Sequence, residues 1–330
     1  MGDINAPAAE SLIKDLGNKP SSGDVSFTSC DVTNYSDVYN LFRTAHSKHG
    51  HIDHAISCAG IFETGAWFDP NLTIDTVGEQ QAPTAVIDVN LMGSANFSRI
   101  AVVFLRDGMT DAEKTSKEKS LLLLSSVNAF RESPGLYMYQ TSKHAIQGLM
   151  RSMRKIMYER DHVRVNCVCP GVTQSPMTDG IWQKFRDADL YWQSAESVAM
   201  IILGIVCKEG MSGKAVYIEG GEGWEFEDSF YREQPRWLGE EPTRRMRVNT
   251  EAVQKVSRLT RCASGSEADD IAGCVGQVDA SLCPSHTQTW PTTFQLPHSG
   301  CQPNAICANI VLVVLLCSFL YLRPPRRSRE

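Results

Sequence analysis

Along the first two thirds of the chain, short apolar runs alternate with longer stretches whose apolar positions recur at helical spacing. This alternation predicts an α/β fold in which helices cover both faces of a parallel sheet. The run at 120–126 (SLLLLSS) is apolar up to its polar end, which is typical of a strand buried on both faces. We expect the other strands at 25–28, 54–57, 163–169 and 215–219, and helices at 6–16, 35–48, 84–106, 139–160 and 194–208.

The pattern changes near residue 250. Residues 250–261 carry a helical pattern, but 262–303 are rich in Ser, Thr, Gly, Pro and Gln and poor in aliphatic residues. Such a composition is typical of linkers or disorder, because it offers little apolar surface to bury. We therefore assign residues 1–250 to one domain and 251–304 to a linker or disordered segment.

Residues 305–322 (AICANIVLVVLLCSFLYL) form an uncharged apolar stretch of 18 residues. As a helix it would span about 27 Å, at the short end of what a bilayer core of roughly 30 Å requires. We predict a transmembrane helix here, followed by a basic tail at 323–330 whose four arginines favour the cytosolic side. The protein would then be membrane-associated, with its main domain in the cytosol. The alternatives are a buried strand or helix, or a read-through tail, in a cytoplasmic protein.

Composition narrows the function classes. The chain has 330 residues, of which 42% are hydrophobic and 21% charged, as in an ordinary globular protein. A net charge of −6 argues against nucleic acid as a partner, since a nucleic-acid binder presents a basic face. The eleven cysteines show no zinc-like spacing with histidine, so we expect no metal site.

The strongest chemical pattern is Tyr139-Gln-Thr-Ser-Lys143, with Ser126 thirteen residues before it at the end of an apolar strand. Spacing of four on a helix places the side chains of Tyr139 and Lys143 on one face, one turn apart. A phenol ordinarily has a pKa of about 10, and a neighbouring ammonium favours the phenolate needed for acid–base work. A serine hydroxyl at the mouth of the sheet can hold the substrate oxygen beside that phenol.

With these residues in this order, the sequence resembles the short-chain dehydrogenase/reductase family over about residues 1–250. The resemblance implies a doubly wound, Rossmann-like parallel sheet. The residues that carry it are Asp31, Ala59-Gly60, Asn90, Ser125-Ser126, Tyr139 with Lys143, and Pro170-Gly171 followed by Ser175-Pro176-Met177.

The resemblance also implies roles for the catalytic set. Tyr139 would donate or accept the proton, Ser126 would orient the substrate oxygen, and Lys143 would favour the phenolate and hold the nicotinamide ribose. Asn90 would anchor a water in the proton relay. The plainer alternatives are ordinary helix-surface positions for Tyr139 and Lys143 and a helix cap for Asn90.

For the cofactor, the resemblance places Asp31 near the adenine and Ala59-Gly60 close to the dinucleotide backbone. Val172 and Ser175 would lie near the nicotinamide carboxamide, and Asp3 would take the adenosine ribose hydroxyls. A carboxylate there repels a 2′-phosphate, so we expect NAD in preference to NADP. The alternatives are a disordered terminal residue for Asp3 and a loop cap for Ser175.

Two departures from the family pattern matter. Ser57-Cys58 stands before Ala59-Gly60 where the family has two asparagines. The chain also begins where the second strand should end, so we expect the fold to lack the first strand and its Gly-rich turn, which cradles the pyrophosphate.

We therefore expect an NAD(P)-linked oxidoreductase acting on a secondary alcohol or ketone. The segment 177–192 carries Met177, Ile181, Trp182, Phe185, Tyr191 and Trp192, and as a lid it would suit an apolar or ring-bearing substrate. A helix packed on the sheet is the other interpretation of that segment. The alternative from a different class is a remnant, or an incomplete gene product, that binds no dinucleotide. The family's frequent homo-oligomers are a further expectation.

Overall fold

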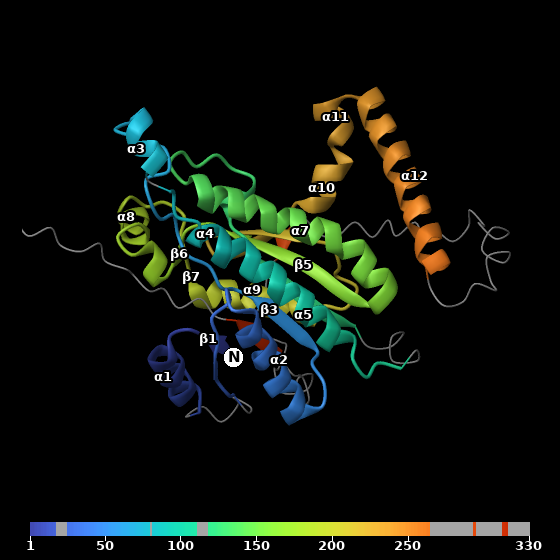
Figure 1. The fold of residues 1–330 in the computed structure, drawn as a ribbon, viewed down its shortest axis with the longest axis horizontal. Coiled ribbons are helices and arrows are strands. Elements are labelled where there is room, and N and C mark those ends of the chain that lie inside the picture. Colours follow the sequence, from blue (N-terminus) through green and yellow to red (C-terminus); the bar gives the residue numbers. More distant parts are fainter. Residues whose placement is uncertain (18–24, 80, 111–117, 265–292, 295–311, 316–330) are drawn as a thin grey trace, which may run out of the picture. The chain divides into compact units, whose positions relative to one another are not determined.

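The computed structural model describes residues 1–17, 25–79, 81–110, 118–264, 293–294 and 312–315. These residues fall into two compact units, one made of Met1–Phe226 with Thr293–Glu330 and the other of Glu227–Thr292. The first unit holds the sheet and all of the candidate site residues (Figure 1). The domain boundary near residue 250 stays a prediction.

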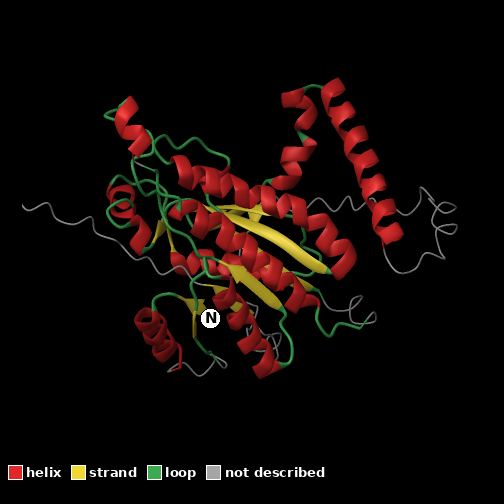
Figure 2. Cartoon of the chain, viewed as in Figure 1, coloured by secondary structure: helices red, strands yellow, loops and turns green. Residues whose placement is uncertain are grey.

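The first unit is built on one large, mostly parallel sheet (Figure 2). Its strand order is β10-β9-β8-β5-β4-β3-β11-β1-β2, and only the pairings of β9 with β8 and β10 are antiparallel. A separate small sheet pairs β6 with β7. The strands are β1 (Gly2–Asp3), β2 (Thr28–Ser29), β3 (His54–Ser57), β4 (Lys119–Leu124), β5 (Val163–Pro170), β6 (Thr173–Gln174), β7 (Gln193–Ser194), β8 (Ala215–Glu219), β9 (Glu222–Glu225), β10 (Thr293–Phe294) and β11 (Leu312–Leu315).

Helices connect the parallel strands, as the alternating sequence pattern predicts. In the first unit they are α1 (Ala6–Gly17), α2 (Tyr35–His49), α3 (Ile74–Glu79), α4 (Ala85–Ile87), a π-helix (Asp88–Gly93), α5 (Ser94–Arg106), α7 (Tyr137–Asp161), α8 (Trp182–Asp187) and α9 (Ala195–Cys207). The second unit contains α10 (Glu227–Arg232), α11 (Gln234–Leu238) and α12 (Glu240–Ser264). The beginning of the segment expected to be a linker is therefore helical.

The sheet buries both of its faces. In β4, Leu121 and Leu123 join the core under α2, α5 and α7, while Leu122 joins a second core under α9. Successive strand residues point to opposite faces, which is why an uninterrupted apolar run is needed here. Figure 1 shows α5 and α7 lying over one face of the strands. This arrangement confirms the predicted doubly wound α/β fold.

Polar caps set the ends of the connecting helices. The side chain of Asn34 accepts hydrogen bonds from the backbone of Ser36 and Asp37, so α2 begins where the sequence predicted. Ser194 caps α9 in the same way, through the N–H of Ser197. These caps fix where each helix leaves its strand, and so help to fix the loops at the carboxyl edge of the sheet.

The predicted transmembrane helix at 305–322 is wrong for the part that the structure describes. Leu312–Leu315 form strand β11, which pairs with β3 on one side and with β1 on the other. The physical reason is that an apolar, β-branched run suits the middle of a buried parallel sheet as well as it suits a bilayer. No helix among the described residues has the length and apolar character needed to cross a membrane. The remainder of 305–322 and the basic tail lie outside the described residues.

Candidate active site

The candidate residues gather where parallel strands end. Asp3 is the last residue of β1, Ala59-Gly60 follow β3, and Ser126 follows β4. Asp31 follows β2, and Val172 and Ser175 follow β5. Carboxyl ends of parallel strands share one edge of a sheet, and this edge is where open α/β sheets bind their ligands.

Tyr139 and Lys143 lie one turn apart near the start of α7, and both are buried. Their residues are 7% and 4% exposed, so neither is an ordinary helix-surface position. The Nζ atom of Lys143 lies 5.6 Å from the centre of the Tyr139 ring and donates a hydrogen bond to the carbonyl of Leu124 (3.2 Å). The ammonium is therefore held between the end of β4 and the phenol that the sequence marks as the acid–base group.

Two serines tie the end of β4 to its neighbours. Ser125 donates from its hydroxyl to the carbonyl of Lys143 (2.7 Å), which joins β4 to α7. Ser126 is 7% exposed, and its Oγ accepts the backbone N–H of Asn128 (3.2 Å) at the start of a short 3-10 helix. The Ser126 side chain is thus held by the backbone that follows it, and the neighbouring Ser125 makes the bond to α7.

Asn90 sits in the π-helix that interrupts the long helix predicted at 84–106. Its side-chain oxygen accepts the N–H of Ile61 (2.7 Å), and its nitrogen donates to the carbonyl of Ile61 (3.0 Å) and to Oγ of Ser142 (3.1 Å). A single π turn inside a helix often marks a functional position. Here it lets one side chain join the loop after β3 to α7. Its predicted role in a proton relay stays a prediction.

Gly60 makes the closest approach in this cluster. A Cβ added there would lie 3.2 Å from Oδ1 of Asn90 and 3.4 Å from Nζ of Lys143. A side chain at this position would therefore require Oδ1 of Asn90 to shift slightly and would bring the Cβ into contact with Nζ of Lys143. The preceding Cys58 is a packed thiol, because burial raises its pKa to about 12 and keeps it protonated at neutral pH.

The sequence analysis missed Glu63 and Phe62, in the loop after Ala59-Gly60. Oε2 of Glu63 accepts the backbone N–H of Tyr139 (2.7 Å), and the Phe62 ring packs on the Tyr139 ring with centroids 5.0 Å apart. Oε1 of Glu63 is buried and has no hydrogen-bond partner among the described residues. No periodic pattern marks these residues, and their closeness to Ala59-Gly60 in sequence was the only available signal.

On the other side of β11, Asp3 and Asp31 are structured but differ in burial. Asp3 is 2% exposed, its carboxylate accepts the N–H of Asn5 (2.8 Å), and its backbone carbonyl accepts the N–H of Cys30 (3.0 Å). Asp31 is exposed, and its carboxylate accepts two hydrogen bonds from Thr33, one from the backbone N–H and one from the hydroxyl. Asp3 is therefore an ordered residue of the sheet rather than a disordered terminus.

After β5, Val172 and Ser175 lie in the loop that leads to α8. The carbonyl of Val172 accepts the N–H of Gln193 (3.0 Å), and Oγ of Ser175 lies 3.2 Å from Oγ1 of Thr178. Beyond them the rings of Trp182 and Trp192 pack with centroids 5.3 Å apart. No described contact brings these residues onto Tyr139 or Lys143, so their cofactor roles stay predictions.

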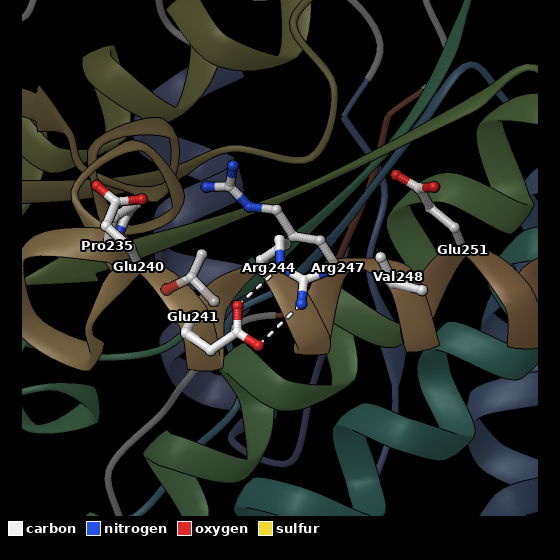
Figure 3. Close-up of a pocket in the computed structure, with 8 residues that line it drawn as sticks. Pro235, Glu240, Glu241, Arg244, Arg247, Val248 and Glu251 are labelled. Carbon is white, nitrogen blue, oxygen red and sulfur yellow. Dashed lines mark hydrogen bonds and ion pairs between the residues drawn. The ribbon is translucent and has the colours of Figure 1, made fainter.

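A surface hollow lies in the second unit, along α12 (Figure 3). Its lining is mostly charged, and within it Glu241 accepts a hydrogen bond from Arg244 (2.8 Å) as well as one from the neighbouring Arg245 (2.8 Å). These bonds lower the pKa of Glu241 below its usual value. The hollow shares no residue with the candidate site, and its charges are those expected on a solvated helix face.

Comparison with known proteins identifies the family. The family model described as "short chain dehydrogenase" matches residues 1–185, more than half of the chain. The chain therefore belongs to the short-chain dehydrogenase family, as the ordered motifs predicted. The family generally binds NAD or NADP.

Individual relatives share moderate similarity. Short-chain dehydrogenase/reductase prx4 of Penicillium rubens is 31% identical over 161 residues, which cover 47% of this chain and 45% of that protein. The 3-oxoacyl-[acyl-carrier-protein] reductase FabG of Thermotoga maritima is 28% identical over 228 residues, covering 67% of this chain and 85% of FabG. The match thus spans less than half the length of the Penicillium relative. A 3-oxoacyl-[acyl-carrier protein] reductase structure from Brucella melitensis superposes with a TM-score of 0.52 at 20% identity, covering 67% of this chain and 84% of that one, which supports the fold.

Proposed function

We propose that this chain is an NAD(P)-dependent oxidoreductase that interconverts a secondary alcohol and a ketone. One observation carries the proposal: the buried ammonium of Lys143 lies 5.6 Å from the centre of the Tyr139 ring and donates to the carbonyl of Leu124, two residues before Ser126 at the carboxyl end of β4. A phenol, an ammonium and a hydroxyl so arranged suit proton transfer to or from a substrate oxygen.

In this proposal Tyr139 Oη gives a proton to the ketone oxygen or takes it from the alcohol. The Lys143 charge favours the phenolate, and the Ser126 hydroxyl orients the reacting oxygen. A bound dinucleotide would supply or accept the hydride. The residues that fit it are Gly60, where a Cβ would crowd Asn90 and Lys143, and Lys143 itself. Asn90, held by Ile61 and Ser142, would connect the site to solvent through a water.

We further propose a preference for NAD. The Asp3 carboxylate is buried at the end of β1, where a 2′-phosphate would meet an uncompensated negative charge. Asp3→Ser is expected to lower the ratio of turnover with NAD to turnover with NADP. For the substrate we propose an apolar or ring-bearing compound, supported by the contact between the rings of Trp182 and Trp192 beyond the Val172–Ser175 loop.

The test is NADH and NADPH formation with a panel of secondary alcohols. Tyr139→Phe is expected to lower turnover by at least about a hundredfold, the usual contribution of a positioned acid–base group. Tyr137→Phe is the matched control, because Tyr137 lies on the same turn of α7, is 42% exposed and packs on Phe68. Equal turnover in Tyr139→Phe and wild type would refute the assignment.

A second candidate is a family member that binds no dinucleotide. It is favoured by the strand order, because the sheet position that precedes the phosphate-binding turn in this fold is taken by β11 and not by a strand that leads into α1 or α2. Calorimetric titration with NAD and NADP separates the two candidates. Absence of binding together with absence of turnover supports this second function, and low-micromolar NAD binding contradicts it.

A further inference from the structure

Strand β11 joins two parts of the sheet that have no other backbone pairing among the described strands. On one side Leu312–Leu315 pair with His54–Ser57 of β3, and on the other Leu315 pairs with Gly2 of β1. The strands β1 and β2 pair with each other, and β3 continues into β4 and β5. Within the described strands, then, β1 and β2 reach the rest of the sheet only through β11.

The edge of β3 that faces β11 is buried. Ala55 is 0% and Ile56 is 3% exposed, and the opposite edge of β3 is already paired with β4. With β11 in place, the backbone groups on this edge have partners in Leu312–Leu315. Without a strand there, any of these groups shielded from water would cost free energy comparable to a lost hydrogen bond. The stretch 305–322 supplies a strand that carries no charge.

The register aligns the two halves of the candidate site. Leu315 pairs with both Gly2 and Ser57, and Ser57 pairs with Leu123. Asp3 and Leu124 each lie one residue beyond this row, at the same level of the sheet. Leu124 is the residue whose carbonyl holds Lys143 (3.2 Å), so β11 sets Asp3 level with the end of β4.

We propose that the space between β1 and β3 is a strand-binding site that is filled in cis by the chain's own Leu312–Leu315. When this segment is in place, the sheet is continuous. The strands β1 and β2, which carry Asp3, are then joined to β3 and β4, which lie next to Tyr139 and Lys143. The pairing of β11 with β1 and β3 does not depend on the proposed function. Only its importance for dinucleotide selection rests on that function. The site fits a parallel, uncharged strand, with backbone partners on both sides.

The test cuts the chain after it has folded. A specific protease site is placed between residues 295 and 304 of the full chain, and the cleaved protein is passed over a size-exclusion column in buffer without detergent. A seated strand keeps the fragment containing Leu312–Leu315 with the main body. Val313→Pro and Val314→Pro each remove a backbone donor from the strand, so at least one of them should release the fragment. Val313→Ala and Val314→Ala keep the donor and serve as matched controls.

Hydrogen exchange on the uncut chain gives a reading that does not depend on activity. In the releasing proline variant, amides of Gly2–Asp3 and of His54–Ser57 should exchange about tenfold faster or more, while those in the middle of β5 change little. Release of the wild-type fragment from a main body with unchanged melting temperature would overturn the proposal. So would a dimer in which differently tagged copies exchange fragments, because the strand would then come from a second copy. Failure of dinucleotide binding alone would refute the proposed function and leave the strand site intact.

Discussion

The backbone N–H of Tyr139 donates to Oε2 of Glu63 at 2.7 Å, so a carboxylate from the loop after β3 holds the first turn of α7. Helix N-termini carry unpaired N–H groups and a partial positive charge, which an acidic side chain satisfies. Glu63 therefore helps to position the phenol of Tyr139, because it binds the backbone N–H of Tyr139 itself. The Phe62 ring, packed on the Tyr139 ring, restricts the same side chain from the other direction.

Replacing Glu63 with Ala is expected to lower the free energy of unfolding by about 1.5–3 kcal/mol, the contribution of a hydrogen bond to a charged group. Glu63→Gln keeps an acceptor and should recover about half of that loss. Urea denaturation measures both variants. Glu132→Ala, an exposed acid in the loop before α7, is the control. If Glu63→Ala and Glu132→Ala have the same midpoint, the Glu63 contact does not stabilise α7.

Gly60→Ala is expected to reduce the proposed turnover by about tenfold or more, which corresponds to roughly 1.4 kcal/mol of barrier. The reason is that the new Cβ would press on Oδ1 of Asn90 (3.2 Å) and Nζ of Lys143 (3.4 Å). Initial rates with NAD and a secondary alcohol check this. Gly148→Ala is the matched control, since nothing lies within 4 Å of its added Cβ in the middle of α7.

The control variant Gly148→Ala is itself expected to change the stability of the protein. Alanine is favoured over glycine inside a helix, so Gly148→Ala should raise the free energy of unfolding by about 0.5–1 kcal/mol with unchanged turnover. A loss of activity in Gly148→Ala as large as that in Gly60→Ala would show that the Gly60 effect is not local to the site.

Asn90→Ala should destabilise the fold, because it leaves the N–H and C=O of Ile61 without their side-chain partner, while Ser142 keeps its bond to the carbonyl of Tyr139. Each buried group left unpaired costs about 1–3 kcal/mol. Asn71→Ala, which removes an exposed hydrogen bond to Asp69, should change stability far less. Urea denaturation measures both variants, and their midpoints are compared where the dependence of the unfolding free energy on urea is the same. Equal midpoints for Asn90→Ala and Asn71→Ala would contradict the bridging role of Asn90.

The sequence predicted those parts of the fold that depend on local patterns. The apolar run of β4, the Asn34 cap of α2 and the Tyr139–Lys143 spacing in α7 each follow from residues near in sequence. The 84–106 helix was located, but the π turn around Asn90 was not, because it depends on the contact with Ile61 across the sheet edge.

Other features could not be predicted because their determinants are distant in sequence. The place of Leu312–Leu315 in the sheet depends on the strand edges of β1 and β3 with which they pair, and no sequence window around residue 313 contains those strands. The Glu63 contact likewise joins a loop to a helix 76 residues away. The sequence could place Tyr139 and Lys143 on one helix face, but it could not show which loop carboxylate would hold that helix.

Stability should depend on pH through His54. Burial lowers the pKa of His54 to about 4 from its usual 6.5, with Arg164 and Lys119 acting in the same direction and Asp53 opposing them. Between pH 6.5 and pH 4, His54 is therefore protonated in the unfolded chain but not in the folded chain. As a result, the free energy of unfolding falls as the pH is lowered through this range. The full effect is about 3 kcal/mol.

Urea denaturation from pH 7 to pH 4 checks the His54 effect. His54→Gln should show a flatter dependence, after allowance for its lost contact with Ser120 (2.9 Å). His144→Gln, on the exposed face of α7, should keep the wild-type slope. Identical slopes in wild type and His54→Gln would rule out His54 as the source.

The pairing of Gly2 with Leu315 also bears on how the protein is made. These residues lie 313 positions apart in sequence, so β1 leaves the ribosome long before the strand that must lie beside it. Sheets that rely on such distant partners close late and fold slowly. During synthesis the edges of β1 and β3 that face β11 would stay open, exposed to chaperones and to other nascent chains, until residues 312–315 emerge.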